Sequence, residues 1–295
     1  MKSPFPVVGI LGAGHLSKML VAPAIALGID LKFFTGDATD VVAVREFAQD
    51  CDLLSYEYGA VPISVIRAIE AEGATIRPSS ATLMKISDLA QIKTPVPEGV
   101  IAVSVLVARS PHAQASVWTP TQIYGKEGVW TRTETPVIGI SKEVINQAQN
   151  KALEIALALS LTGVMSVELY LHDGEFKLCG ALMTPHSSGY WTMEGSRTDQ
   201  FEQHLRAILD LPLGDTSMTS SFVVVGNVMA GTKADMYRPY LHLMARSPAM
   251  KFHQYGVNFI PGREVAHVSA LGDDLLDLRE CITHAVDYMS GEIDE

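Results

Sequence analysis

A glycine-rich turn near the start of the chain has the composition of a phosphate-binding loop. The glycines of Gly9-x-x-Gly12-x-Gly14 follow an apolar strand-like run and precede a stretch with helical spacing. Such glycines let backbone N–H groups approach a phosphate at the start of a helix. The full dinucleotide fingerprint needs one more small residue and an acid about 20 residues on. Here Ser17 takes the last glycine position and Asp37 is displaced from the acid position. The glycine motif therefore fits either a loop that contacts a phosphate or a tight turn without a ligand.

Two carboxylates, Glu57 and Glu168, lie at positions suited to a functional site. Glu57 directly follows the short apolar run 52–56, where ligand-binding loops of parallel sheets are found. Glu168 lies inside another apolar run, and a carboxylate there is costly unless it is paired or binds a metal. Because Ser166 and Tyr170 share its side of the pleat, a solvent-exposed face explains Glu168 equally well. From spacing alone, Glu57 and Glu168 can each be either a site residue or an ordinary solvent-exposed carboxylate.

The histidines and cysteines form no known catalytic or metal motif. The sequence has no His-Glu-x-x-His and no Cys-x-x-Cys spacing, and the loop containing His186 and Ser188 is not a Gly-x-Ser-x-Gly elbow. Three cysteines, far apart, are odd in number and therefore predict reduced thiols in a cytoplasmic protein.

Composition excludes several classes of protein. Hydrophobic residues make up 47% of the 295 residues and charged residues 19%, which is typical of globular domains. The net charge of −11 argues against a broad nucleic-acid surface. No apolar stretch reaches the roughly 18–20 residues needed to cross a bilayer, so no membrane partner is expected. The first residues also lack the apolar core of a signal peptide.

The elements that must position these residues fall into successive groups. Residues 1–93 alternate strands with helices, which predicts a parallel sheet with helices on its faces. The expected strands are 7–11, 31–34 and 52–56, and the expected helices are 15–27 and 63–73.

A proline-rich break at residues 92–99 separates this part from the next, because two prolines so close together do not continue a helix. Residues 94–230 then mix strands with helices that begin after Ser141 and Asp199, two residues suited to N-caps. Residues 231–295 predict a small β-rich unit followed by an acidic helix. The expected strands after the break are 100–108, 116–121, 128–133, 164–171, 176–182, 221–228, 242–245, 251–255 and 264–270.

Blocks of sequence spread over the whole chain match one known family in order. They are the glycine turn (9–20), the Cys-Asp-Leu-Leu-Ser-Tyr-Glu-Tyr run (51–58), a strand (103–109), the run around Glu168 (163–169), the Ser-Gly-Tyr-Trp-Thr block with the helix after it (188–214), and the C-terminal His-Gln-Tyr-Gly and Pro-Gly-Arg blocks (253–256, 261–263). With these motifs the chain resembles N5-carboxyaminoimidazole ribonucleotide synthase, the ATP-grasp carboxylase of purine biosynthesis.

The resemblance implies a fold, a reaction and a set of site residues. It implies a Rossmann-like pre-ATP-grasp domain (1–93), an ATP-grasp domain (94–230), a small β-rich domain (231–295), and a homodimer. The family uses ATP and Mg²⁺ to join bicarbonate to 5-aminoimidazole ribonucleotide, releasing ADP and phosphate. The implied metal ligand is Glu168. The implied substrate- or phosphate-binding residues are Gly12, Ala13, Gly14, His15, Glu57, Arg109, His186, Ser188 and Arg263.

The chain departs from the family at positions that hold ATP. Only residues 94–102 stand where the family has a whole ATP-holding subdomain, and about nine residues cannot fold into one. Expected carboxylates are replaced by Ala102 and Gly180, expected cations by Thr184, Val257, Ile260 and Glu264. We therefore predict a degenerate member without ATP hydrolysis of its own, which keeps at most a nucleotide pocket. The alternative is an active ligase whose clamp is completed by other residues or by a partner chain.

Overall fold

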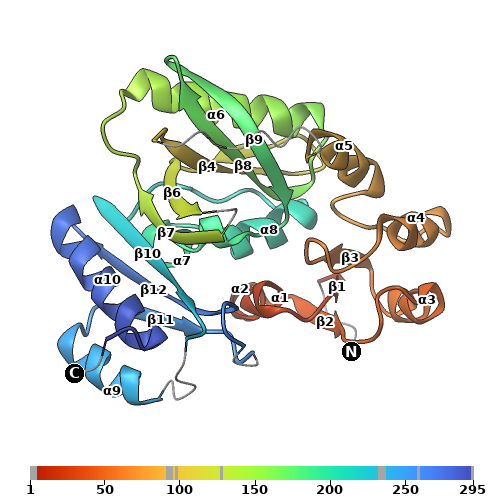
Figure 1. Cartoon of the computed structure of the whole chain (residues 1–295). Coiled ribbons are helices and arrows are strands. Elements are labelled where there is room, and N and C mark those ends of the chain that lie inside the picture. The colour runs from red at the N-terminus through yellow and green to blue at the C-terminus, as the bar shows by residue number, and fades with distance from the viewer. Residues whose placement is uncertain are drawn as a thin grey trace.

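The structure is a computed structural model that describes residues 5–90, 96, 99–126, 129–231, 237–257 and 260–293. It is a mixed α/β protein with a small parallel sheet and a larger antiparallel one, as the sequence predicts (Figure 1). No helix among these residues combines the length and the apolar character that a membrane crossing requires.

The N-terminal part is built on a parallel sheet in the order β2-β1-β3. The strands are β1 (Val7–Leu11), β2 (Asp30–Phe34) and β3 (Leu53–Tyr56), and their register places Leu11 opposite Tyr56. The helices are α1 (His15–Met19), α2 (Val21–Leu27), α3 (Val41–Gln49), α4 (Ile63–Ala71) and α5 (Ser80–Ala90).

The helix predicted over residues 15–27 is instead two short helices that meet at Leu20. Pro23 explains the break, because it lacks an N–H and its ring would clash with the carbonyl four residues earlier. The first helix has only five residues. Its dipole therefore contributes little to anion binding, and charged side chains must supply that attraction.

The larger sheet follows the order β11-β12-β10-β7-β6-β4-β8-β9, with β5 paired to β4. Its described strand pairs are all antiparallel. The strands are β4 (Ala102–Arg109), β5 (Ala115–Val117), β6 (Thr121–Lys126), β7 (Val129–Thr135), β8 (Gly163–His172), β9 (Glu175–Met183), β10 (Phe222–Met229), β11 (Lys251–Gln254) and β12 (Glu264–Gly272).

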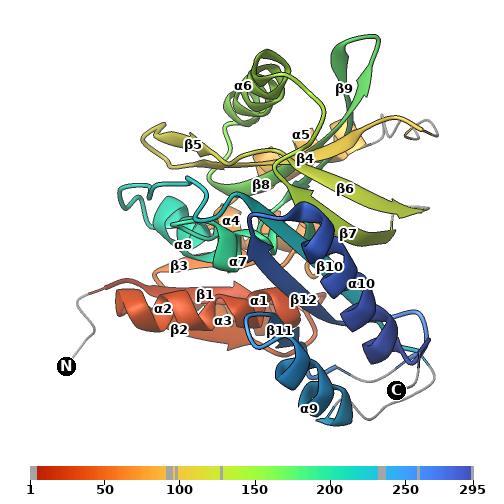
Figure 2. The same ribbon diagram turned by 90° about the vertical axis from the view of Figure 1, so that its left-hand side faces the viewer.

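Helices cover this sheet and join it to the parallel one. α6 (Lys142–Ala158) lies over β4 and β8, and α10 (Leu275–Ser290) crosses β10 and β12 (Figure 2). α8 (Gln200–Ile208) packs on β8 between the two sheets. The remaining helical segments are a 3₁₀ turn (Ser187–Gly189), α7 (Thr192–Gly195) and α9 (Tyr237–Arg246).

Two predicted strands are wrong. The strand predicted at 116–121 is divided between β5 and β6 around Pro120, which cannot donate to a strand ladder. The strand predicted at 242–245 lies within α9. Tyr240 and Leu243, three residues apart, both pack into the core beneath α10, which is helical rather than strand spacing.

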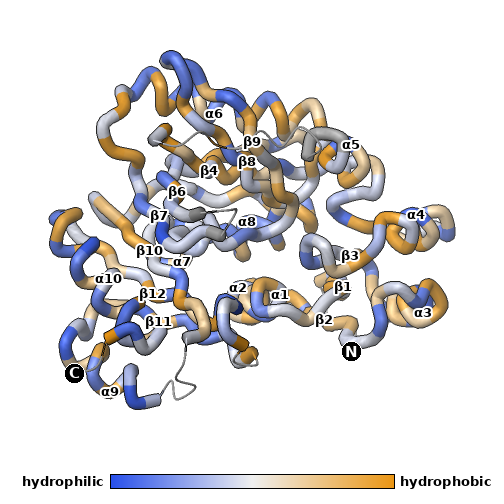
Figure 3. The backbone as a smooth tube through the Cα atoms, in the orientation of Figure 1, coloured by the Kyte–Doolittle hydropathy of each residue, from blue (hydrophilic) through white to orange (hydrophobic). Residues whose placement is uncertain are grey.

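Hydrophobic residues concentrate along the inner strands, whereas exposed turns such as the one between β8 and β9 are hydrophilic (Figure 3). The strands before and after residue 230 belong to one sheet, since β10 pairs with both β7 and β12. The division into domains at residues 93/94 and 230/231 stays a prediction.

Candidate functional site

The glycine turn after β1 is closed by the carboxylate of Glu57. A side chain at Gly14 would overlap that carboxylate, and Gly12 has a φ of +115°, a conformation that favours glycine. The backbone N–H of Glu57 donates to Leu11 O at 3.1 Å, and Ser17 Oγ donates to Glu57 Oε2 at 2.7 Å. A phosphate placed directly on the turn would therefore meet a negative charge.

This packing makes Gly14 a sensitive position. We expect Gly14→Ala to lower the free energy of unfolding by about 1–3 kcal/mol, because the added methyl group must displace a fixed carboxylate. Urea denaturation measures the change. The matched variant Ser17→Ala removes the hydrogen bond to Glu57 without filling the space, and it should cost about 1 kcal/mol. Equal stability of Gly14→Ala and wild type would contradict the described packing.

A stack of aromatic rings connects the turn to the C-terminal strands. His15 stacks on Tyr255 with ring centroids 4.0 Å apart, and its Nε2 lies 2.8 Å from the Tyr190 hydroxyl. Tyr190 in turn stacks on His267 at 3.9 Å. The site is therefore assembled from segments separated by more than 170 residues in sequence.

Burial keeps the histidines of this stack neutral. It lowers the pKa of His267, and the neighbouring His253 and His15 lower it further. It also lowers the pKa of His15, where Glu57 acts in the opposite direction and the charges of Arg263 and Lys18 reinforce burial. The rings therefore offer hydrogen bonds and flat apolar surfaces rather than positive charge.

Tyr255 links the partly buried Glu264 and the buried His267, both on β12. Its hydroxyl donates to Glu264 Oε1 at 2.7 Å and lies 2.9 Å from His267 Nδ1. Because the Tyr255 hydroxyl donates its proton to Glu264, its oxygen can only accept from His267. The neutral His267 ring therefore carries its hydrogen on Nδ1. Its Nε2, which is buried and has no hydrogen-bond partner, is then an available acceptor.

A hollow of about 320 Å³ opens beside the stack. Its floor and rim combine two histidines, a tyrosine and the cation of Lys18, and Arg263 lies close enough to influence His15 electrostatically. Its lining residues are His15, Lys18, Met19, Phe252, His253, Gln254 and Tyr255. The hollow therefore suits a small ligand with an anionic group and a flat ring.

The structure brings together Gly12, Gly14, His15, Glu57 and, through its charge, Arg263, with Ala13 between the two glycines. The binding role of each stays a prediction. Sequence reasoning missed Tyr190, Tyr255 and His267 as site residues. Part of the signal was in the sequence, because His253 and Tyr255 are two residues apart in the predicted strand 251–255, a spacing that places both side chains on one face.

His186 and Ser188 lie in a separate buried cluster. Ser188 Oγ is 3.0 Å from His186 Nδ1 and 2.8 Å from Ser104 Oγ, which is 2.7 Å from Ser166 Oγ. Burial lowers the pKa of His186 to about 4, so its ring is neutral. The cluster satisfies its own hydrogen bonds and anchors the loop that carries Tyr190.

Arg109 lies at the end of β4, away from the glycine turn. Its guanidinium donates to Leu161 O at 2.8 Å, which ties the end of the strand to the chain leaving α6. The structure does not bring this arginine to the other predicted residues, and its role in binding stays a prediction.

The predicted metal ligand Glu168 faces a position without a side chain. Its partner across the β8–β9 ladder is Gly180, and Trp130 Nε1 donates to Glu168 Oε1 at 3.1 Å. Within the described ranges, no three His, Cys, Asp or Glu residues form a group that could hold a metal. Mg²⁺ between ATP phosphates and protein commonly uses one or two carboxylates with near-octahedral geometry. The donors at this position of the β8–β9 ladder do not fit a two-carboxylate nucleotide clamp.

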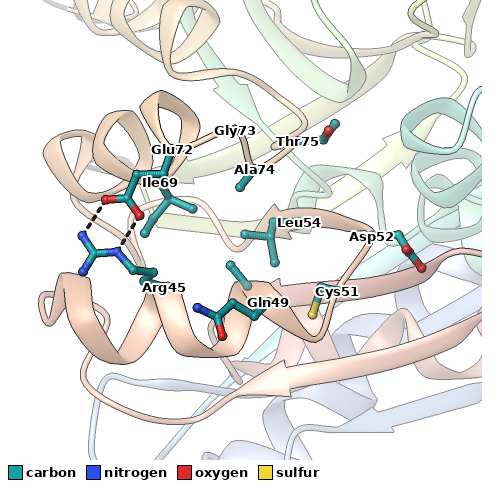
Figure 4. A pocket seen from close by; sticks show the side chains of 11 residues that line it. Arg45, Gln49, Cys51, Asp52, Leu54, Ile69, Glu72, Gly73, Ala74 and Thr75 are labelled. Atoms are coloured by element: carbon teal, nitrogen blue, oxygen red, sulfur yellow. Dashed lines mark hydrogen bonds and ion pairs between the residues drawn. The ribbon is translucent and has the colours of Figure 1, made fainter.

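A second hollow of about 360 Å³ lies between α3 and α4 (Figure 4). Arg45 and Glu72 form a two-bond ion pair at its rim, and Cys51 and Leu54 lie deeper. Burial raises the pKa of Cys51 to about 11, so its thiol is a poor nucleophile. This hollow contains no residue of the predicted site.

Comparisons with known proteins agree with this architecture. The model of the ATP-grasp domain matches residues 98–201. The structure of N5-carboxyaminoimidazole ribonucleotide synthetase from Thermus thermophilus superposes with a TM-score of 0.82 and 21% identity, covering 98% of this chain and 99% of that one. The ATP complex of the Aspergillus clavatus synthase gives 0.85 and 20%, covering 98% and 99%. The chain thus has the fold of the ATP-grasp proteins to which it is similar.

Sequence comparison finds relatives of one kind over nearly the whole chain. The N5-carboxyaminoimidazole ribonucleotide synthase of Mycobacterium tuberculosis is 28% identical over 377 residues, covering 97% of this chain and 88% of the relative. The Corynebacterium ammoniagenes enzyme is 27% identical, covering 96% and 92%. The chain is thus similar to N5-carboxyaminoimidazole ribonucleotide synthases over nearly its whole length, which confirms the resemblance. Since the chain has 295 residues and the alignment spans 377, a block of the relatives has no counterpart here.

Proposed function

We propose that this chain binds a phosphorylated aminoimidazole ribonucleotide beside the ring stack and does not hydrolyse ATP on its own. The observation that carries the proposal is the pairing of Glu168 with Gly180, which leaves a single carboxylate at the position of the β8–β9 ladder where the resemblance implies two. One carboxylate is a poor anchor for a cation that must bridge two phosphates.

The connection between α5 and β4 supports the same conclusion. Only residues 91–101 separate the two elements, whereas the resemblance implies a whole ATP-holding subdomain between the corresponding sequence blocks. Phosphoryl transfer depends on positioning and charge neutralisation, so loss of the chain that covers ATP removes most of the catalysis. We infer that this short connection stands where the family has its ATP-holding subdomain.

The ribonucleotide side has a more complete set of groups. Lys18 and Arg263 supply positive charge near the hollow, and the Tyr255 and His15 rings supply a flat surface for a five-membered ring. Glu57, held by Ser17, is an acceptor for a ribose hydroxyl or an amine. One relative was solved with ADP and 5-aminoimidazole ribonucleotide, a ligand of this chemical class.

A phosphate-release assay tests the first half of the proposal. The purified chain receives Mg-ATP, bicarbonate and 5-aminoimidazole ribonucleotide. We expect release no faster than in a protein-free blank, against turnover of about 1–10³ s⁻¹ for a typical enzyme. Ribonucleotide-dependent phosphate release in that range would overturn the proposal.

Calorimetric titration with 5-aminoimidazole ribonucleotide tests the second half. We expect binding that Arg263→Ala and Glu57→Ala each weaken about tenfold, the equivalent of one lost charged contact. Arg197→Ala is the matched control, because Arg197 is an exposed arginine paired with Asp215. Unchanged affinity in both site variants would place the ligand elsewhere.

The second candidate is an active carboxylase whose clamp is completed by a partner chain. The match to synthases over 97% of this chain, together with retention of Glu57, Glu168 and Arg263, favours it. The homodimer stays a prediction. Phosphate release that rises with the square of protein concentration would support this candidate over the first.

A further inference from the structure

A carboxylate on α7 is hydrogen-bonded to a histidine that lines the hollow beside the ring stack. Glu194 accepts a hydrogen bond from His253 Nε2 at 2.7 Å and another from the buried Ser269 Oγ at 2.8 Å. Thr219 Oγ1 donates to the backbone carbonyl of Glu194 at 2.9 Å. The Glu194 side chain is only 15% exposed. The carboxylate is therefore fixed by contacts with three separate segments of the chain.

The bond to Glu194 decides which nitrogen of His253 carries the hydrogen. An ionised carboxylate only accepts, so Nε2 donates, and the neutral ring presents Nδ1 as an acceptor. Within the part of the chain that the structure describes, no residue hydrogen-bonds to this Nδ1. The ring also stacks on His267, with centroids 4.5 Å apart and planes inclined by 17°. Glu194 and His267 thus hold His253 in one orientation.

The ring of His253 is accessible to a ligand in that hollow. It is one of the groups that line the volume of about 320 Å³, and its side chain is 24% exposed. Two other rings of the lining use polar atoms within the fold, because the Tyr255 hydroxyl donates to a carboxylate and His15 Nε2 lies 2.8 Å from the Tyr190 hydroxyl. The ammonium of Lys18 supplies donors only. A ligand that brings an N–H group into the hollow therefore meets a fixed acceptor in His253 Nδ1.

We propose that His253 recognises the exocyclic amine of the ribonucleotide through Nδ1, and that Glu194 is a positioning residue that keeps His253 in its accepting form. This inference rests on the ribonucleotide binding proposed above and names the residue that selects the ligand by its amine. A nucleotide of the same shape without the amine leaves the Nδ1 acceptor without its donor. The site should therefore prefer an aminoimidazole ribonucleotide to the plain imidazole ribonucleotide.

Calorimetric titration of the full chain with two probes tests this recognition. The probes are 5-aminoimidazole ribonucleotide and imidazole ribonucleotide, which lacks the amine. We expect wild type to bind the first about five- to tenfold more tightly, the equivalent of one hydrogen bond. His253→Phe keeps a ring against His267 but removes both nitrogens, and it should abolish the preference. His172→Phe is the matched control, because His172 is an exposed histidine at the β8–β9 turn.

Two further measurements separate positioning from folding. His253→Asn places a carbonyl oxygen near the position of Nδ1, so it should restore part of the preference for the amine. In ¹⁵N spectra of the histidine-labelled chain without ligand, at about pH 8 where an ordinary imidazole is neutral, the wild-type His253 ring should carry its hydrogen on Nε2. Glu194→Ala should give a mixture of both ring forms and a weaker preference, with circular dichroism to check that it folds.

The outcomes distinguish this inference from the proposed function. Equal binding of the two probes by wild type, an unchanged preference in His253→Phe, or a wild-type His253 ring with its hydrogen on Nδ1 would overturn this inference alone. Failure of both probes to bind wild type would overturn the proposed ribonucleotide binding together with it. None of these results bears on ATP hydrolysis.

Discussion

Replacing Glu134 by glutamine is expected to lower the free energy of unfolding at pH 7 by about 2–3 kcal/mol. Glu134 is 1% exposed and lies at the end of β7. It accepts two hydrogen bonds from Arg279 of α10, at 2.9 and 2.7 Å, and one from Tyr124 at 2.9 Å. Breaking a fully buried ion pair costs about 3–5 kcal/mol, and partial exposure of the guanidiniums reduces that figure here.

The loss of unfolding free energy in Glu134→Gln should become smaller at acidic pH. Burial alone would raise the pKa of Glu134, but hydrogen bonds from Arg279 and Tyr124 and the charge of Arg132 hold it below its usual value. A carboxylate with a lowered pKa stabilises the fold above its unfolded pKa of about 4.3 and loses that effect as pH falls further. The gap between wild type and Glu134→Gln should therefore shrink below about pH 4.3.

Urea denaturation at a series of pH values measures this gap. The control is Glu175→Gln, because Glu175 is exposed and paired only with the exposed Lys177 on its own strand. We expect the control to change stability by less than about 0.5 kcal/mol. A Glu134→Gln variant as stable as that control would show that the cluster does not secure α10 to the sheet.

Gly180→Glu is expected to make the unfolding temperature rise when Mg²⁺ is added, an effect that the wild type lacks. The Cβ of a residue at 180 would lie 3.1 Å from Glu168 Oε2, on the adjacent strand. Two carboxylates that close repel each other and should destabilise the metal-free variant by about 1–2 kcal/mol. Mg²⁺ at ten times its dissociation constant would restore about 1.4 kcal/mol.

Thermal unfolding with and without Mg²⁺ measures that response. Gly180→Gln is the matched control, because it adds the same bulk without the second charge and should not respond to the cation. An equal rise in unfolding temperature for wild type and Gly180→Glu would mean that the natural chain already binds Mg²⁺. The proposal that it does not hydrolyse ATP would then lose its main support.

Local patterns predicted much of the architecture. Apolar runs separated by glycine turns predicted the parallel strands, and the His-Asp-Gly turn predicted the β8–β9 hairpin. Ser141 and Asp199 are N-caps as expected, and each side chain accepts hydrogen bonds from the first turn of its helix. These features depend on residues a few positions apart, so the sequence displays them directly.

Contacts between distant segments could not be predicted in the same way. The stack of His15, Tyr190, Tyr255 and His267 joins four segments, and no spacing in sequence brings them together. Short apolar runs such as 242–245 fit a strand or a helix, and only packing beneath α10 selects the helix. Arg109 matched a family motif, yet its guanidinium is used within the fold.

The position of β10 between β7 and β12 has a consequence for how the chain is made. β7 ends at Thr135, but its neighbour β10 begins only at Phe222. At about 5–20 residues per second on the ribosome, one edge of β7 waits several seconds for its partner. An unpaired strand edge can capture another nascent chain. We expect protection by chaperones during translation to decide how much protein reaches the native state.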